Sequence, residues 1–185
     1  MKAMPKEKKI HSKTVYDTDF LTVEEDDVLL PSGKTGKRVK VKHIGAAASL
    51  PITKEGDVLL IRQHRYVIGQ DTLEIPAGKK DEIDEDSLVC AKRELEEETK
   101  YRAKDFEFLQ SVYTAIGFSD ERIDIYIAKD VYPLKNPPKA DDDEYVEVVK
   151  MPLQDAIKKA ENGEIKDAKT VLALFGVKVK FCATN

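Results

Sequence analysis

The alternation of apolar and polar residues predicts a chain made mainly of short strands. The segment before about Thr14 is rich in lysine and shows no pattern, so we expect a frayed terminus there. From Val15 to His43 the pattern is strand, turn and strand, which is typical of an antiparallel sheet. Further strands are predicted at residues 45–52, 58–62, 73–75, 106–113, 122–128 and 145–151.

Helical spacing predicts three helices later in the chain. Residues 86–99 repeat leucine and alanine at intervals of three and four positions, and Asp86 is a suitable N-cap. A second helix is predicted from a proline at 152 to a glycine at 163, and a third at 167–175. Because strands and helices follow one another in mixed order, the predicted fold class is α+β.

The charge balance gives no general attraction to nucleic acid or to a membrane surface. The chain has 31 basic and 35 acidic residues, a net charge of −4. Its longest weakly polar stretch, 44–52, is far shorter than a membrane helix requires, and the Lys-rich start lacks the apolar region of a signal peptide. We therefore expect a cytoplasmic protein whose two cysteines, Cys90 and Cys182, are ordinary reduced thiols.

The predicted helix at 86–99 carries an acidic cluster next to Arg93. Helical geometry places Glu94, Glu97 and Glu98 on one face, where like charges repel by about a few tenths of a kcal/mol per pair. A solvated acidic face would explain this arrangement, and so would a bound divalent cation. Because the cluster offers only oxygen ligands, the candidate ions are Mg²⁺ or Mn²⁺ rather than zinc.

The residues around this cluster resemble the Nudix box. A strand at 73–75 leads through Pro76 and Ala77 to Gly78, and Glu85 stands eight residues before Arg93. The match extends over residues 78–101 and departs from the family pattern at two places. Six residues rather than five separate Gly78 from Glu85, and Lys100 stands where the pattern has glycine.

This resemblance implies a Nudix fold, a mixed sheet between helices, preceded here by an N-terminal antiparallel sheet. It also implies hydrolysis of a diphosphate bond with a bound divalent cation, which neutralises charge on the leaving phosphate and holds the attacking water. No covalent nucleophile is required. The positions implied as metal ligands are the Ala77 carbonyl, Glu94, Glu97 and Glu98, with Arg93 and Glu97 also implied in catalysis and Glu85 in orienting the cluster.

Segments outside the box are similar to the ADP-ribose pyrophosphatase branch of the family. This resemblance extends from about residue 15 to 175 and implies Mg²⁺-dependent cleavage of ADP-ribose, or of a related nucleoside diphosphate sugar, to AMP and ribose 5-phosphate. Ile116 stands where the branch usually has proline, so GDP-mannose and other nucleotide sugars stay open. A nucleotide-sensing Nudix domain without activity is a further alternative. The segments that carry the similarity are 61–66, 73–78, 117–121 and 142–148.

The branch also implies roles for four residues beyond the box. Arg65 would contact the substrate phosphates, although a surface salt bridge would equally explain an arginine there. Glu74 would contact the adenine or a neighbouring polar group. Glu144 would act as general base from a loop, with Glu121 as the second candidate, whereas the acidic run that contains Glu144 is also typical of a solvated linker.

The N-terminal strands resemble the element through which this branch exchanges strands into a homodimer. We therefore predict an extension over residues 1–43 that serves dimerisation, and a Nudix hydrolase domain over residues 44–185. A partner subunit would then help to complete the adenine site.

Overall fold

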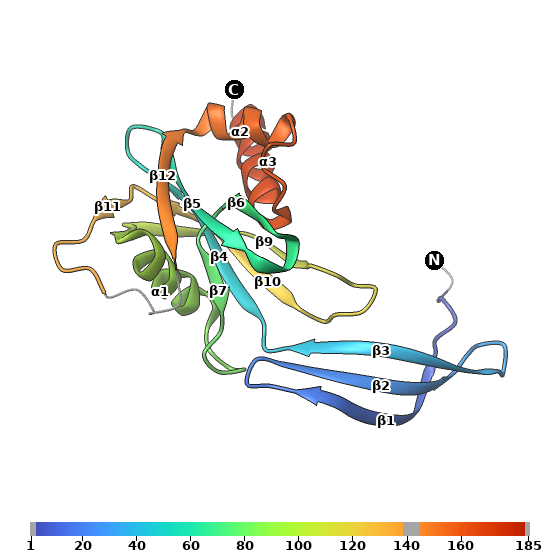
Figure 1. Ribbon diagram of the computed structural model, residues 1–185. Coiled ribbons are helices and arrows are strands. Elements are labelled where there is room, and N and C mark those ends of the chain that lie inside the picture. Colours follow the sequence, from blue (N-terminus) through green and yellow to red (C-terminus); the bar gives the residue numbers. More distant parts are fainter. Residues whose placement is uncertain (1–2, 139–144, 184–185) are drawn as a thin grey trace. The chain divides into compact units, whose positions relative to one another are not determined.

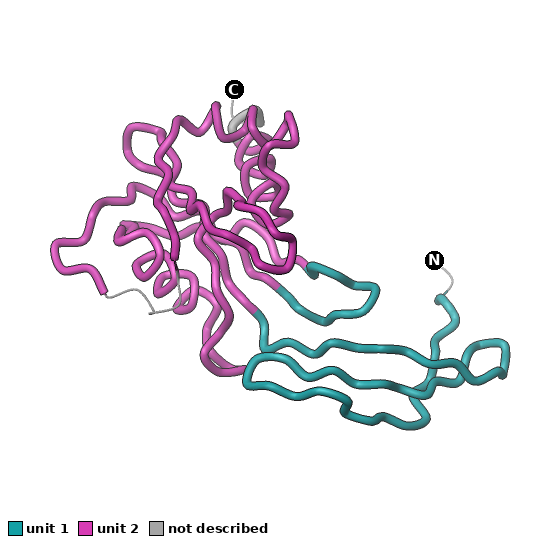
Figure 2. Tube along the Cα trace, in the orientation of Figure 1, with its two compact units in different colours: residues 1–45, 113–122 teal, residues 46–112, 123–185 magenta. Residues whose placement is uncertain are grey.

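The computed structural model describes residues 3–138 and 145–183, and side chains as far as residue 180. It divides into two compact units (Figure 2). Unit 1 comprises residues 1–45 and 113–122, and unit 2 comprises residues 46–112 and 123–185. The segment 113–122, which the sequence-based division assigns to the second domain, is therefore grouped with the N-terminal strands.

Unit 1 contains an antiparallel sheet of three strands in the order β1-β2-β3. These strands are β1 (Lys8–Asp17), β2 (Leu21–Leu29) and β3 (Thr35–His43). The expectation of a frayed terminus up to Thr14 was wrong, because β1 pairs with β2 along its length. Its pairing shifts register at two places, and each shift interrupts the two-residue alternation by which a strand is predicted from sequence.

Unit 2 is built around a mixed sheet of seven strands. They are β4 (Ala46–Ile52), β5 (Asp57–Arg65), β6 (Gln70–Glu74), β7 (Ala77–Lys79), β9 (Asp105–Tyr113), β10 (Arg122–Lys129) and β12 (Val146–Pro152). The main order is β12-β5-β4-β10-β9, with β6 paired to β5 and β7 paired to β4. The β4–β10 pair is parallel. A short 3₁₀ helix (Tyr66–Ile68) joins β5 to β6, and β8 (Tyr101–Arg102) pairs with β11 (Tyr132–Pro133).

Three helices cover the two faces of this sheet (Figure 1). They are α1 (Ser87–Thr99), α2 (Leu153–Glu161) and α3 (Ala168–Ala183). Neighbouring residues of one strand point to opposite faces, so Leu60 belongs to the core shared with α2 and α3, whereas Leu59 packs with Leu95 of α1. The predicted α+β class, with a mixed sheet between helices and a separate N-terminal antiparallel sheet, is confirmed.

The structure also bears on membrane-spanning helices and on Cys90. Within the residues that the structure describes, no helix is long and apolar enough to cross a membrane. Cys90 is fully buried, and this burial raises the pKa of its thiol to about 12, as expected for an unreactive thiol.

Candidate active site

Helix α1 begins where the sequence predicts. The Asp86 carboxylate accepts hydrogen bonds from two backbone N–H groups of the first turn, at 2.9 and 3.1 Å. Such a cap satisfies donors that have no partner within the helix, so it fixes the residue at which the helix starts. The position of the start matters because it determines the face on which the three glutamates lie.

The helix ends at Lys100, which adopts a left-handed conformation with φ of 64°. This is the position at which the Nudix pattern has glycine, and glycine adopts that conformation without the steric cost that a side chain brings. The Lys100 ammonium group donates to the carbonyls of Glu97 at 2.7 Å and Pro138 at 2.9 Å. These bonds satisfy a carbonyl of the last helical turn and tie the helix end to the segment that precedes residue 139.

Arg93 connects the acidic face of α1 to the loop that precedes it. One guanidinium nitrogen, Nη1, donates to Glu94 at 2.6 Å and to Glu97 at 3.2 Å. The other, Nη2, donates to the Lys79 carbonyl at 3.1 Å and lies 3.5 Å from the Glu85 carboxylate. Burial alone would lower the pKa of Arg93, but Glu94 and its neighbours raise it above its ordinary value. Arg93 therefore contacts Glu94, Glu97 and Glu85, and the role of Arg93 and Glu85 in orienting the cluster stays a prediction.

Strand β7 passes close to two of the glutamates. A Cβ atom at Gly78 would lie 2.1 Å from Oε1 of Glu94, so any other residue here would displace that carboxylate. Glu98 accepts a hydrogen bond of 2.8 Å from the backbone N–H of Ala77. Both glutamates are buried, with 7% of Glu94 and 5% of Glu98 exposed. The short strand thus places the Ala77 backbone beside the acidic helix face.

The chemistry of these donors fits a hard divalent cation. Glu94, Glu97 and Glu98 offer only carboxylate oxygens, which Mg²⁺ and Mn²⁺ prefer. Within residues 3–138 and 145–180, no three acidic, histidine or cysteine side chains converge as a ready-made metal site. Arg93 donates to both Glu94 and Glu97, so a bound metal ion would share these carboxylates with the guanidinium group.

A second cluster joins the two residues expected to bind substrate. Arg65 donates to both carboxylate oxygens of Glu74, at 2.7 and 2.6 Å, and the hydroxyl of Thr72 donates to the same carboxylate at 2.6 Å. Lys169 also donates to Glu74. Only 2% of Glu74 is exposed, and burial by itself raises its pKa, but hydrogen bonds from Arg65 and Lys169 lower the pKa to about 2. The carboxylate is therefore ionised.

This second cluster borders a cavity and lies near the acidic helix. The pKa of Arg65 is raised first by the hydrogen bond to Glu74 and more weakly by other carboxylates, among them Glu98 of α1. Immediately after Glu74, the N–H of Ile75 donates to Thr170 of α3 at 2.8 Å. The cavity has a volume of about 290 Å³ and is lined by Arg65, Val67, Ile68, Thr72, Glu74, Lys166, Asp167 and Lys169.

Sequence reasoning missed Lys169. Its sequence signal is weak, because one lysine in the first turn of a predicted helix has no evident partner. Lys169 lies 95 positions from Glu74 along the chain, and only the packing of α3 near the end of β6 brings the two together.

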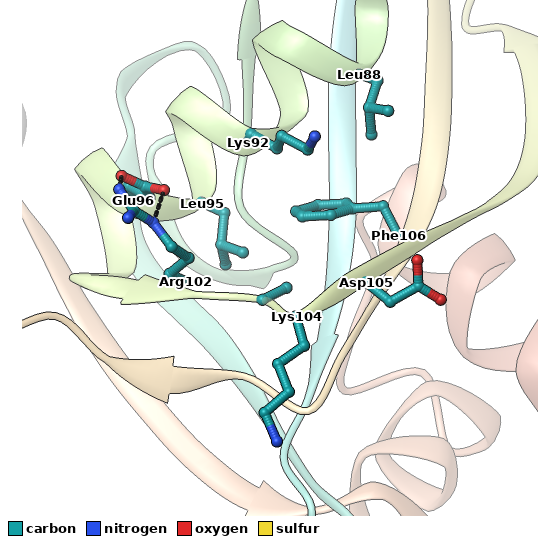
Figure 3. A pocket seen from close by; sticks show the side chains of 9 residues that line it. Leu88, Lys92, Leu95, Glu96, Arg102, Lys104, Asp105 and Phe106 are labelled. Carbon is teal, nitrogen blue, oxygen red and sulfur yellow. Dashed lines mark hydrogen bonds and ion pairs between the residues drawn. The ribbon is translucent and has the colours of Figure 1, made fainter.

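Another cavity of about 290 Å³ lies between α1 and the β8–β9 segment (Figure 3). Its charged groups already have partners: Arg102 forms two hydrogen bonds with Glu96, and the Lys92 ammonium lies 5.6 Å from the centre of the Phe106 ring. None of the residues expected to bind metal or substrate lines this cavity. We therefore do not place the active site there.

Of the two candidate bases, only Glu121 lies within the described residues. Glu144 lies outside the described residues. Glu121 lies in unit 1, where it accepts a hydrogen bond of 2.5 Å from Thr114 and lies 3.8 Å from Nε2 of His43. Sequence reasoning did not predict that His43 lies next to Glu121.

Comparison with known proteins assigns the family. Residues 42–174 match the NUDIX domain, and residues 7–38 match the nucleoside diphosphate sugar hydrolase N-terminal domain. The chain belongs to the Nudix family. The family match confirms the resemblance drawn from the box, and with the relatives below it confirms the expectation of a hydrolase.

Two relatives and one solved structure are similar to this chain over nearly its whole length. ADP-ribose pyrophosphatase of Bacillus subtilis is 38% identical over 174 residues, which cover 94% of each chain. Methanol dehydrogenase activator of Bacillus methanolicus is 39% identical over 168 residues, covering 91% of this chain and 90% of that protein. A crystal structure of an ADP compounds hydrolase, 25% identical, superposes with a TM-score of 0.84 and covers 100% of this chain and 99% of that one.

Proposed function

We propose that this protein hydrolyses the diphosphate bond of ADP-ribose to AMP and ribose 5-phosphate, or that of a related nucleoside diphosphate sugar to the corresponding nucleoside monophosphate and sugar phosphate. One observation carries the proposal: Glu94, Glu97 and Glu98 all lie on α1, where Arg93 donates to Glu94 and Glu97, in a chain that aligns over 94% of its length with an ADP-ribose pyrophosphatase. A sensing domain would need none of these carboxylates for catalysis. Their retention favours an enzyme.

We propose Mg²⁺ as the cofactor, with Mn²⁺ as an alternative. Glu94, Glu97, Glu98 and the Ala77 carbonyl would hold the ion, which supplies positive charge to the leaving phosphate and lowers the pKa of the attacking water. Arg93 keeps two of the carboxylates aligned along one helix face. It also compensates part of their charge, since like-charged neighbours on a helix repel.

We propose Glu144 as the general base that takes the proton of the attacking water, with Glu121 as the alternative. The support for Glu144 is its position in the segment that resembles the branch. The support for Glu121 is its carboxylate, which Thr114 and His43 hold in a defined place within unit 1.

We propose Arg65 as the contact for the substrate diphosphate and Glu74 as a polar contact of the same site. The side chain of Arg65 is 44% exposed and borders a cavity of about 290 Å³, which is large enough for a sugar-sized group. A guanidinium group binds phosphate oxygens in a two-pronged manner. The position of Arg65 at the edge of this cavity supports its proposed role as the phosphate contact.

We also propose a homodimer formed through residues 1–43, in which the partner subunit completes the adenine site. The sheet of unit 1 exposes large apolar side chains, including 58% of Ile10, 60% of Tyr16 and 56% of Val39, and a partner copy would cover such residues. Light scattering would detect a particle of twice the chain mass of 20.8 kDa. A monomer would contradict this part of the proposal.

The protein's location and the absence of nucleic-acid partners stay predictions. Subcellular fractionation tests the expected cytoplasmic location. Gel-shift measurements at physiological salt test the expectation, drawn from the net charge of −4, that nucleic acid does not bind.

The decisive test is product analysis with purified protein, Mg²⁺ and a panel of nucleotides. The panel contains ADP-ribose, ADP-glucose, GDP-mannose, NADH and nucleoside triphosphates, with an EDTA control. NADH belongs in it because one relative is named as a dehydrogenase activator, and dehydrogenases use nicotinamide dinucleotides. The proposal predicts that AMP and ribose 5-phosphate form fastest from ADP-ribose. Fastest cleavage of GDP-mannose would favour the alternative substrate, and tight binding without cleavage would favour the sensor.

A further inference from the structure

The buried carboxylate of Glu74 has two cationic partners, Arg65 and Lys169. Arg65 makes two hydrogen bonds to it, and Lys169 makes a third charged contact. The cations differ in exposure: the side chain of Arg65 is 44% exposed, whereas that of Lys169 is 10% exposed. Arg65 is therefore the outer cation and Lys169 the inner one.

If Arg65 binds a substrate phosphate, it must give up part of its contact with Glu74. A buried carboxylate that loses its only cation is strongly destabilised, because neither water nor another charge replaces it. With Arg65 as the only partner, Glu74 would hold the guanidinium and compete with the substrate. A second cation on the inner side removes this conflict.

We propose that Lys169 is a positioning residue that keeps Glu74 charge-paired, so that Arg65 can turn towards the substrate diphosphate. This inference rests on the proposed function and adds a residue to it. Lys169 acts through Glu74 and Arg65 and does not itself contact the substrate.

The start of α3 holds Lys169 in place for this role. Its ammonium group also lies 3.0 Å from Asp167, whose carboxylate accepts hydrogen bonds from the Thr170 N–H at 3.0 Å and from the Thr170 hydroxyl at 2.5 Å. The same hydroxyl accepts the N–H of Ile75. Helix α3 is thus anchored to the residue that follows Glu74, and this anchoring limits the distance over which Lys169 can move.

The test is Lys169→Met, assayed with ADP-ribose and Mg²⁺. Without the inner cation Glu74 retains Arg65, so KM should rise about 10- to 100-fold while kcat changes less than about threefold. Titration calorimetry in EDTA, where no hydrolysis occurs, should show the same loss of affinity for ADP-ribose. Lys169→Arg, which keeps the charge, should restore most of the affinity. If Lys169→Met does not fold, Lys169→Gln takes its place.

A second substitution separates positioning from direct contact. Glu74→Gln in the Lys169→Met background removes the negative charge that retains Arg65, so the double variant should have a lower KM than the product of the two single effects predicts. If the effects of Glu74→Gln and Lys169→Met on KM multiply, Lys169 does not act through Glu74 and the inference is wrong. The matched control is Lys159→Met, which removes a surface ion pair with Glu164. This control should leave KM and kcat unchanged.

The outcomes distinguish this inference from the proposed function. If the wild-type protein cleaves no compound of the panel, the proposed function fails and the inference fails with it. If the wild type cleaves ADP-ribose but Lys169→Met leaves KM unchanged, or lowers kcat alone, only the role of Lys169 is refuted.

Discussion

Gly78→Ala tests whether β7 and α1 form one catalytic unit. The added Cβ would lie 2.1 Å from Oε1 of Glu94, and ordinary contact begins at 3.4 Å, so the carboxylate must move by about 1.3 Å (3.4 − 2.1). That displacement would break the 2.6 Å hydrogen bond from Arg93 to Glu94. Because the crowded atoms are the end of a flexible side chain, the backbone should keep its course.

The expected effect is large on catalysis and moderate on stability. Misplacing a catalytic group by about 1 Å costs roughly 100-fold in rate, whereas overpacking costs about 1–3 kcal/mol in the free energy of unfolding. We therefore expect the kcat of Gly78→Ala for ADP-ribose to fall by about 100-fold or more. Its thermal transition should stay cooperative and shift by several degrees.

The assay measures kcat over a range of Mg²⁺ concentrations, together with thermal unfolding of the same sample. Gly36→Ala is the matched control, because its Cβ would make an ordinary contact of 3.5 Å with Leu30. A folded Gly78→Ala protein whose kcat is within threefold of the wild type would refute the reasoning, since Glu94 would then not need its present position.

Four further predictions follow from the same structure. Glu98→Gln should leave the fold intact and reduce turnover by several orders of magnitude, and near-normal turnover would argue against a metal ligand there. The pKa of Glu74 is about 2 in the folded protein and about 4.5 in the unfolded chain, so its ionised form stabilises the fold above pH 4.5, and this stability is lost as the pH falls towards 2. Between pH 7 and pH 3 the wild type should therefore lose about 2 kcal/mol of unfolding free energy through Glu74. Glu74→Gln should abolish that part of the decrease, as measured by urea titration at each pH. Lys100→Gly relieves the steric cost of a side chain in the left-handed conformation but loses two side-chain hydrogen bonds. The unfolding free energy should therefore change by less than about 1 kcal/mol, and turnover should be retained. A large gain in turnover would show that lysine impairs the site. Glu144→Gln should slow turnover while KM stays close to the wild-type value, and if only Glu121→Gln behaves this way, the base has been misassigned.

The sequence alone was enough to predict helix α1 and its acidic face. Helical periodicity and the Asp86 cap depend on neighbours within a few residues, so the positions of Glu94, Glu97 and Glu98 on α1 could be predicted from spacing alone. The sequence also marked Lys100 as a departure from the Nudix pattern. The structure shows why glycine is usual there, because that residue has φ of 64°.

Tertiary structure alone decided which distant segments meet. Strand β1 was missed because its register shifts hide the alternation, and only pairing with β2 reveals it. The requirement for glycine at residue 78 comes from the approach of Glu94, on another element. The ion pair between Glu74 and Lys169 joins residues 95 positions apart. Local spacing fixes which residues share a helix face, whereas contacts between elements depend on how the sheet and helices pack, and short-range patterns do not record that packing.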